Sequence, residues 1–515
     1  MKRSTKWLLF LIILLGAALR LYHLGTEPIW YDEAVSLTRA QMAVMDSIDA
    51  TIRTDFFPPL YYIVLHFILL FGNSEFILRL FSALCGILII PLTYDIGKTI
   101  SGKRLAMIST LLVAISPLYV MYSQEARTYS FYLLSATLAM WGLAKLLRYP
   151  MMATQKMFLL RLPASLQQQG TASPDRPVAP LWAWGAYILG SIVTLYCHNT
   201  GVFLPVAANL IALYLFWIER PHFLPLLRNW LIANALVLLV WGLWLPGLLQ
   251  QTFHQSSGKS WFSSDLGSLL EVVNDLWISF VWGPRHILVF LLLILVVLGL
   301  WSWRKHPRWI MFSLTLFLVP VLGHYVVSQW IPMLVTRSMI WASIPLLLMI
   351  AAGLINLRWR FLTWSILTLI IAINVKGLNT YYLNFQKEKW DKVAEYIGER
   401  LQPNDGILIN VGYLKKPFDY YWKHVEKEAV GQPFPSGHAE MEQEDLAELK
   451  RIMTTHDRLW IIYSHTPFGD PKGLLKKSLD DNARLIDQQR FRGTGFQLNC
   501  QANCIQVFLY ETRSH

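Results

Sequence analysis

Charged side chains are scarce in this 515-residue sequence, and hydrophobic side chains are unusually common. Asp, Glu, Lys and Arg make up 15% of the residues, whereas hydrophobic residues make up 54%. Because roughly a quarter of the residues in a soluble domain are charged, the composition argues against a protein that is soluble throughout. Apolar runs of about 17 to 21 residues recur between Trp7 and Gly377, and that length crosses a bilayer core. The runs do not alternate apolar with polar residues, so they predict transmembrane helices rather than a barrel.

Other missing features narrow the classes of function. The four cysteines are too few for a disulfide framework, although Cys500 and Cys504 can pair if they lie in an oxidising compartment. No glycine-rich loop for a nucleotide is present. The net charge of +12 comes from Lys and Arg that lie mostly in short loops beside the apolar runs, as in membrane proteins. A nucleic-acid partner is therefore not predicted.

The apolar runs predict about eleven membrane spans. A further apolar segment, 58–71, has only about 14 residues and is predicted to be interfacial or re-entrant. Counting it as a span would invert every later loop and place the basic clusters outside, against the charge bias that orients membrane proteins. The N-terminus resembles a signal sequence without a cleavage site, so it is predicted to stay cytoplasmic. The predicted spans are 7–24, 77–96, 105–121, 129–147, 181–197, 202–218, 230–249, 286–303, 309–327, 339–356 and 361–378.

The predicted fold is an α-helical polytopic membrane protein with a small C-terminal α/β extracytoplasmic domain. The membrane domain covers 1–378, with a first extracytoplasmic loop at 25–57 and a flexible cytoplasmic linker at 148–180. Residues 386–515 alternate helix-like stretches with strand-like ones, which indicates a three-layer α/β domain, and we find no catalytic motif in it. The predicted strands are 407–411, 459–463 and 505–509, and the predicted helices are 387–400, 442–453 and 473–482.

Polar and ionisable residues gather at the predicted extracytoplasmic ends of the spans. In the first loop, Asp32 and Glu33 can orient a hydroxyl or hold a divalent cation. Alternatively, they cap an interfacial helix at 33–45 and complement its dipole. Asp55 precedes a double proline and the tyrosine pair that begins at Tyr61, which suits either a surface at headgroup level or a plain loop-to-helix turn.

The third, fifth and tenth spans carry ionisable residues at the same predicted side. Arg127 can bind a phosphate with its planar fork while Glu125 orients it, or the two can form a local salt pair. His198 is at a position where a lone histidine is more often a structural hydrogen-bonding group than a ligand or base. Arg337 either meets a phosphate or snorkels to the headgroups. Because all of these clusters lie at one membrane face on the predicted topology, they are candidates for one site.

The elements that stand out are Asp32-Glu33, Pro58-Pro59-Leu60-Tyr61-Tyr62, Phe71-Gly72-Asn73-Ser74-Glu75 with Leu78-Arg79-Leu80, Ser123 through Ser130, Tyr196 with His198, and Arg337. In their order and rough spacing across about residues 1–378, they resemble the membrane glycosyltransferases of the GT-C type, specifically the family 39 group. That group includes protein O-mannosyltransferases and the bacterial aminoarabinose transferases that modify lipid A. The tail from Lys387-Glu388-Lys389-Trp390 into the α/β domain is similar to bacterial members. One position departs, because the residue before the double proline is commonly His or another polar group in this family and here is Phe57. The departure brings into question any substrate or metal contact usually made there.

The resemblance implies that a hexosyl or pentosyl group moves from a polyprenyl-phosphate carrier to an acceptor hydroxyl, with inversion, at the extracytoplasmic face of a bacterial inner membrane. The implied acceptor is a lipid, a glycan or a protein. A donor that arrives sideways from the bilayer needs no nucleotide loop. No cofactor is required by the sequence, and the resemblance allows a divalent metal without requiring one.

The same resemblance assigns roles to residues. Asp32 is the candidate general base, and Glu33 is expected to orient the acceptor, Asp32 or both. Arg127 and Arg337 are the candidates to neutralise the departing polyprenyl phosphate. The candidate substrate-binding residues are Tyr31, Asp55, Tyr61, Glu125 and His198.

Two alternatives belong to other classes. A transporter or flippase for a lipid-linked sugar would place charged groups at the midplane of its spans and often shows two similar halves. Here the charges collect at one face, and no internal repeat is found. A polymerase or ligase of surface glycans shares the lipid donor but needs no acidic pair in the first loop. Replacing Asp32 by Asn separates these hypotheses, because a flippase should keep moving its lipid.

Overall fold

The computed structural model describes residues 3–55, 57–148, 180–218, 223–255, 264–278, 285–331, 333–436, 440–493 and 504–512. The predicted linker at 148–180 therefore lies, apart from its two end residues, outside the described residues.

The chain forms two compact units. The membrane unit comprises Met1–Tyr22, Met42–Ile68 and Arg79–Asn379, and the C-terminal unit comprises His23–Gln41, Leu69–Leu78 and Thr380–His515. The sequence predicts a single division between residues 378 and 386, whereas two short N-terminal segments also belong to the C-terminal unit.

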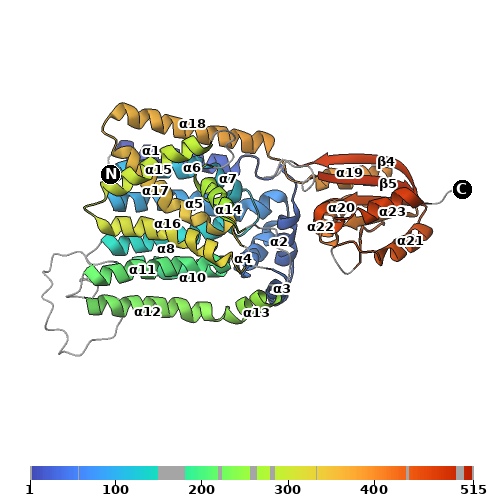
Figure 1. The fold of residues 1–515 in the computed structure, drawn as a ribbon, viewed down its shortest axis with the longest axis horizontal. Coiled ribbons are helices and arrows are strands. Elements are labelled where there is room, and N and C mark those ends of the chain that lie inside the picture. Colours follow the sequence, from blue (N-terminus) through green and yellow to red (C-terminus); the bar gives the residue numbers. More distant parts are fainter. Residues whose placement is uncertain are drawn as a thin grey trace. The chain divides into compact units, whose positions relative to one another are not determined.

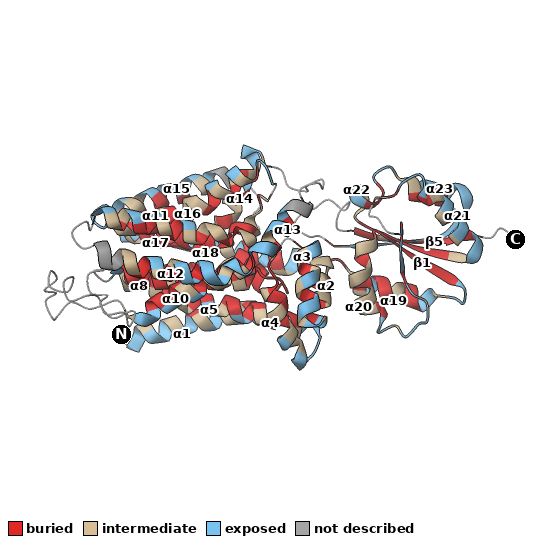
Figure 2. Cartoon of the chain, turned by 90° about the horizontal axis from the view of Figure 1, so that it is seen from below, coloured by how far each residue is buried: buried red, intermediate tan, exposed pale blue. Residues whose placement is uncertain are grey.

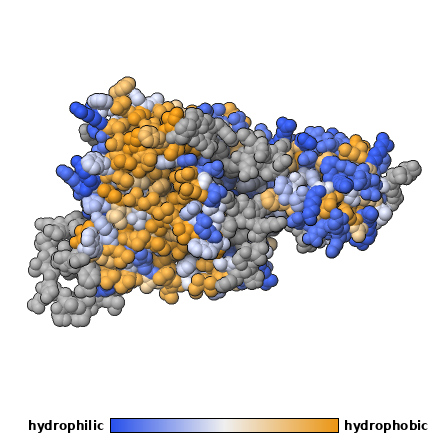
Figure 3. Space-filling model, in the orientation of Figure 1, coloured by the Kyte–Doolittle hydropathy of each residue, from blue (hydrophilic) through white to orange (hydrophobic). Residues whose placement is uncertain are grey.

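Seven helices among the described residues are long and apolar enough to cross a membrane, or nine if each of two bent pairs is one span. The helices of this unit run side by side, and hydrophobic side chains cover much of the face in view (Figures 1 and 3). The chain is thus a multi-pass membrane protein. All eleven predicted spans fall on helices, although the count of eleven itself stays a prediction. The seven are α1 (Arg3–Leu21), α5 (Glu75–Ser101), α8 (Tyr129–Arg148), η3 (Asn199–Val202) with α11 (Phe203–Ile218), α16 (Pro307–Val327), η5 (Thr336–Ala342) with α17 (Ser343–Ile355), and α18 (Arg360–Asn384).

Two bent pairs and five shorter helices complete the membrane unit. The helices α6 (Lys103–Ile115) and α7 (Pro117–Ser123) meet at 54°, because Pro117 lacks an N–H and drives the preceding Ser116 out of the helical conformation. The pair α12 (Phe223–Gly242) and α13 (Leu245–Gln255) is bent by 59°. The shorter helices are α3 (Val44–Thr54), α4 (Leu60–Ile68), α10 (Leu181–Cys197), α14 (Leu266–Trp277) and α15 (Arg285–Ser302).

Glycines let α15 and α17 pack backbone against backbone. A Cβ atom on Gly353 would lie 2.0 Å from the carbonyl oxygen of Leu295, and one on Gly299 would lie 2.1 Å from that of Met349. Only a residue without a Cβ fits at these two positions. Nearly all of α17 is buried inside the membrane unit (Figure 2).

The C-terminal unit is built around a five-stranded sheet with the order β2-β1-β3-β5-β4. The strands β2, β1 and β3 are parallel, whereas β5 runs antiparallel to both of its neighbours. The three predicted strands are confirmed as β1 (Asp405–Asn410), β3 (Arg458–Tyr463) and β5 (Cys504–Glu511). The sequence analysis missed β2 (Gln432–Pro433), which has two residues, and β4 (Arg484–Arg492), a mostly exposed edge strand without an apolar run.

Two apolar clusters, one on each face of the sheet, give the unit three layers. Alternate residues of β1 point to opposite faces, so Ile407 and Ile409 join one cluster and Leu408 the other. The first cluster holds side chains of α19 (Trp390–Arg400) and α20 (Lys415–Trp422), and the second those of α21 (Asp445–Thr455) and α23 (Leu474–Asn482). The predicted three-layer α/β domain is therefore confirmed. The short elements η6 (Gly412–Leu414) and α22 (Thr466–Gly469) follow β1 and β3.

Two N-terminal segments are held by α20. The N–H of Ile29 donates to Oη of Tyr421 at 2.7 Å, and the same hydroxyl donates to the Glu75 carboxylate at 3.0 Å. The neighbouring Tyr420 donates to the carbonyl oxygen of Asn73 at 3.0 Å. These bonds tie α2 (Tyr31–Gln41) and the segment that contains η1 (Leu69–Phe71) to the C-terminal unit.

The cysteines divide between the two units. Cys85 and Cys197 of the membrane unit are free and buried. Cys504, the first residue of β5, is disulfide-bonded, whereas Cys500 lies outside the described residues.

Candidate functional site

The predicted site residues fall into two groups. Asp55, Tyr61, Glu125, Arg127, His198 and Arg337 belong to the membrane unit, whereas Tyr31, Asp32 and Glu33 belong to the C-terminal unit.

Two arginines that are far apart in the sequence meet at one tyrosine ring of the membrane unit. Cζ of Arg127 lies 5.9 Å from the centroid of the Tyr129 ring, and Cζ of Arg337 lies 5.5 Å from the same centroid. Arg127 also lies over the ring of Phe57 at 5.1 Å and is buried. Guanidinium groups at these distances are attracted by the negative face of an aromatic ring. The two guanidinium groups therefore lie against one buried ring.

Hydrogen bonds from buried side chains hold the backbone around Arg127. The hydroxyl of Tyr61 shares a hydrogen bond of 3.1 Å with that of Ser82, which donates to the carbonyl oxygen of Arg127 at 3.3 Å. Thr128 donates to the carbonyl oxygen of Cys197 at 3.0 Å. Tyr61, a predicted substrate contact, is therefore observed as a buried support of the arginine segment.

The segment of Arg337 is fixed through the residue that follows it. The carbonyl oxygen of Ser338 accepts hydrogen bonds from the hydroxyls of Tyr132 at 3.3 Å and Thr200 at 2.9 Å. Nε1 of Trp341 donates to the Tyr132 hydroxyl at 2.7 Å. Because α8, η3 and η5 all contribute to this network, the turn that presents Arg337 is tied to the helix that carries Tyr129.

His198 takes part in the same network as a structural group. Its Nδ1 accepts the N–H of Thr200 at 3.2 Å, and its ring stacks on that of Tyr132 at a centroid distance of 5.2 Å. The ring of Phe57 lies 4.8 Å away. The structural alternative for His198 thus matches the contacts that are observed, and a substrate contact from it stays a prediction.

Two carboxyl groups of the membrane unit are also buried. Oδ2 of Asp55 accepts the Tyr62 hydroxyl at 2.6 Å, and Asp55 is 7% exposed. Glu125, two residues before Arg127, is 2% exposed. A buried carboxyl group is costly without hydrogen-bonding or charged partners, so both residues belong to the packed polar interior of this unit.

The acidic pair lies in the first turn of α2, which begins at Tyr31 and ends at Gln41 rather than spanning 33–45. The Glu33 carboxylate forms an ion pair of 3.0 Å with Nζ of Lys387, and both side chains are almost completely buried. The ring of Tyr31 lies 4.7 Å from that of Tyr413 in η6. Burial, together with the neighbouring Tyr31 and Glu388, raises the pKa of the Tyr413 hydroxyl above its usual value, so this group stays protonated at neutral pH.

Within the described ranges, no three or more His, Cys, Asp and Glu side chains are grouped so that they could hold a metal ion. A bound divalent metal therefore stays an expectation from the resemblance.

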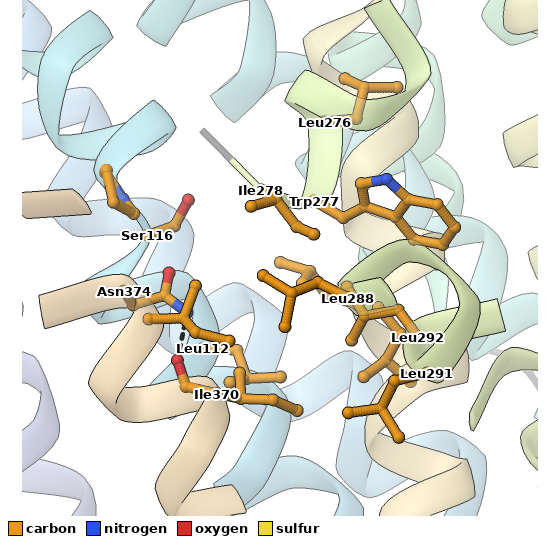
Figure 4. Close-up of a pocket in the computed structure, with 14 residues that line it drawn as sticks. Leu112, Ser116, Leu276, Trp277, Ile278, Leu288, Leu291, Leu292, Ile370 and Asn374 are labelled. Carbon is orange, nitrogen blue, oxygen red and sulfur yellow. Dashed lines mark hydrogen bonds between the residues drawn. The ribbon is translucent and has the colours of Figure 1, made fainter. Parts of the chain in front are cut away.

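An apolar pocket lies in the membrane unit, next to the break between α6 and α7. Ser116 at the break and Asn374 of α18 are its polar lining residues, and Leu112, Trp277 and Leu292 are among the apolar ones (Figure 4). Nδ2 of Asn374 donates to the carbonyl oxygen one turn earlier, at 2.9 Å. Most of the side chains that line the pocket are apolar.

Several residues of these clusters were given no role from the sequence. Phe57 was noted only as a departure, and Tyr129 and Tyr132 were not singled out. Tyr129 and Tyr132 are three residues apart and therefore on one helix face, which was the signal in the sequence that could have indicated them. Lys387 was noticed as part of a similar tail, but nothing in the sequence indicated that it reaches Glu33.

Comparison with known proteins supplies a family match for part of the chain. Residues 57–153 match the family model described as dolichyl-phosphate-mannose-protein mannosyltransferase. A search of curated proteins finds no match.

Solved structures are similar over nearly the whole chain. ArnT from Cupriavidus metallidurans bound to undecaprenyl phosphate has 13% identity and a TM-score of 0.59, with 99% of each chain covered. The oligosaccharyltransferase of Archaeoglobus fulgidus in the apo form has 10% identity and a TM-score of 0.52, with 100% of this chain and 75% of that chain covered. At these identities the likeness concerns the fold. The resemblance inferred from the sequence is thus confirmed for the fold: this chain has the GT-C fold of ArnT and of the archaeal oligosaccharyltransferase, and residues 57–153 match the mannosyltransferase family model.

Proposed function

We propose that this chain is a glycosyltransferase that moves a sugar from a polyprenyl-phosphate carrier to an acceptor hydroxyl. The transfer takes place at the extracytoplasmic face of a bacterial inner membrane. The observation that carries the proposal is the convergence of Arg127 and Arg337 on the ring of Tyr129.

The two arginines bind the phosphate of the donor. As the bond between the anomeric carbon and the phosphate oxygen breaks, the electron pair stays on that oxygen and negative charge grows on the phosphate. Guanidinium groups stabilise this charge most when they are fixed in advance and kept from bulk water. The hydrogen bonds that hold both arginine segments provide such a fixed arrangement.

Asp32 acts as the general base. It takes the proton of the acceptor hydroxyl as that oxygen attacks the anomeric carbon from the side opposite the leaving phosphate, so the configuration inverts. Glu33 keeps the first turn of α2 in place, since its own carboxylate is engaged by Lys387.

The polyprenyl chain stays in the apolar part of the membrane unit. ArnT of Cupriavidus metallidurans, which has the same fold, was solved with undecaprenyl phosphate bound.

The C-terminal domain lies in an oxidising, extracytoplasmic compartment. The disulfide bond of Cys504 supports this location, since disulfides persist in such compartments. The acceptor that meets the domain there is a lipid, a glycan or a protein.

The test uses labelled polyprenyl-phosphate sugars and membranes with and without the chain. We expect label to move to a product in its presence. Asp32→Asn should reduce the rate of transfer by about a thousandfold, because the variant loses the general base and its contribution to orienting the acceptor hydroxyl. Lys392→Met, which changes an exposed lysine of α19, is the control. Lipid movement without product, unchanged by Asp32→Asn, would establish the flippase instead.

A further inference from the structure

The acidic helix α2 is held by the C-terminal domain through a buried ion pair. The Glu33 carboxylate and Nζ of Lys387 are 3.0 Å apart, with side-chain exposures of 0% and 4%. Lys387 lies in the C-terminal part of the chain, beyond the end of α18. The residue next to the candidate base is therefore fixed by a segment that lies outside the predicted membrane domain.

Further contacts hold the same stretch. The Glu27 carboxylate lies 3.0 Å from Nζ of Lys389, and it also accepts the N–H of Lys387 at 3.2 Å. The rings of Tyr31 and Tyr413 are in contact. Since the contacts occur before the helix and in its first turn, they restrict both the position and the rotation of α2.

The segment Lys387-Glu388-Lys389-Trp390 alternates between two partners. Its lysines reach the N-terminal stretch, whereas Trp390 belongs to the domain's own core and Glu388 is buried beside it. The Glu388 carboxylate accepts Nε1 of Trp390 at 2.6 Å and pairs with Nε2 of His465 at 2.8 Å. Trp390 is fully buried against the sheet. The backbone that carries the two lysines is thus held in place by the contacts of Glu388 and Trp390.

A buried ion pair of this kind is a positional constraint more than a source of stability. Removing two charges from water costs about as much as their attraction returns, whereas deleting one partner leaves an uncompensated buried charge. A buried ion pair at a functional helix therefore fixes the relative position of its two side chains, which an apolar pair would not do.

We propose that Lys387 is a positioning residue for catalysis: by holding Glu33 it fixes the first turn of α2, and with it the Asp32 carboxylate. The C-terminal domain is then part of the catalytic apparatus rather than an appendage. This inference rests on the proposed role of Asp32 as general base.

The kinetic test compares Lys387→Met, Glu33→Gln and the double variant in the full-length protein. A displacement of about 1 Å at the reacting groups costs about a hundredfold in rate. We expect each single variant to lose about that factor in kcat, with little change in KM for the lipid donor. The double variant should lose no more than either single one, because the two residues act through one contact. Lys387→Arg keeps the charge and should restore most of the rate. Lys392→Met is the matched lysine control in the same domain.

A structural readout separates the inference from the proposed function. Hydrogen exchange of residues 27–41 should be faster in Lys387→Met than in the wild type and unchanged in Lys392→Met and Asp32→Asn. If Lys387→Met does not fold, the double variant, which removes both charges of the pair, takes its place.

The outcomes are distinguishable. Wild-type kcat or wild-type exchange in Lys387→Met would overturn the inference even if Asp32→Asn abolishes transfer. A wild-type chain that transfers no sugar would instead overturn the proposed function, while the exchange experiment still tests whether Lys387 holds α2.

Discussion

Replacing Arg127 or Arg337 by glutamine is expected to slow sugar transfer strongly while leaving the membrane unit folded. Removal of one fixed donor from a developing oxyanion costs about 2.7 to 4 kcal/mol, or about 10²- to 10³-fold in kcat. Because both guanidinium groups lie on the same ring and are proposed to meet the same phosphate, the double variant should lose less than the product of the two single effects.

Lysine variants separate charge from shape. Lysine keeps the positive charge but loses the planar fork and the stacking on aromatic rings, which is worth about 0.5 to 2 kcal/mol. The expected loss is about 2- to 30-fold. Arg127 lies over two rings, at 5.1 and 5.9 Å, and Arg337 over one, at 5.5 Å, so Arg127→Lys should be the slower of the two variants.

The assay measures initial rates of transfer from a labelled polyprenyl-phosphate sugar in proteoliposomes. Arg304→Gln is the matched control, because Arg304 also lies over a ring, that of Trp301 at 5.0 Å, but both residues are exposed. Folded glutamine variants that keep wild-type kcat and KM would refute the phosphate-binding role, and equal rates for the two lysine variants would refute the role given to the rings.

Three further predictions concern helix packing, the pH dependence of stability, and Phe57, which departs from the residue common in the family. Gly353→Val should lower the thermal midpoint in detergent by several degrees, since its Cβ would meet a carbonyl oxygen of α15 at 2.0 Å, whereas Gly185→Val, with open space around it, should not. Equal midpoints would contradict the close packing. Burial alone would raise the pKa of Asp480, but the hydrogen bond and charge of Lys476 lower it below its usual value. The resulting stability is present at neutral pH and is lost as the pH falls through the lowered pKa, so exchange of α23 should accelerate in acid, and less so in Asp480→Asn. Phe57→His should weaken the support of the nearby guanidinium group and reduce kcat by about 2- to 30-fold; an increase in rate would show that the polar residue is tolerated at this position.

Much of the fold followed from local patterns. The helix predicted at 387–400 is observed as α19, and its buried face is formed by Trp390, Val393, Ala394 and Ile397. The three apolar strands were found because their residues are buried on both sides of the sheet. The edge strand β4 was not predicted because it is mostly exposed, so it has no apolar run, and it pairs with β5 alone among the described strands.

The candidate site was only partly predictable. Charged residues near the ends of apolar runs stand out from the sequence because they are costly there without partners. Which of them meet cannot be read from a pattern, because the contacts join helices that are remote in the chain. Tyr61 and His198 illustrate the limit: both are observed in hydrogen bonds that support the backbone, and their substrate contacts stay predictions.

The sequence by itself determined that this chain crosses a membrane many times, that an α/β domain follows, and that its polar residues collect at the span ends. Hydrophobic length and periodicity are local properties, so no tertiary contact is needed to recognise them. Only the tertiary structure brought Arg127 and Arg337 to one tyrosine ring and Lys387 to Glu33. The ion pair forms because buried charges need partners of opposite sign, whereas the arginines are attracted to the face of the ring. Which groups come within reach depends on how segments that are remote in the chain pack.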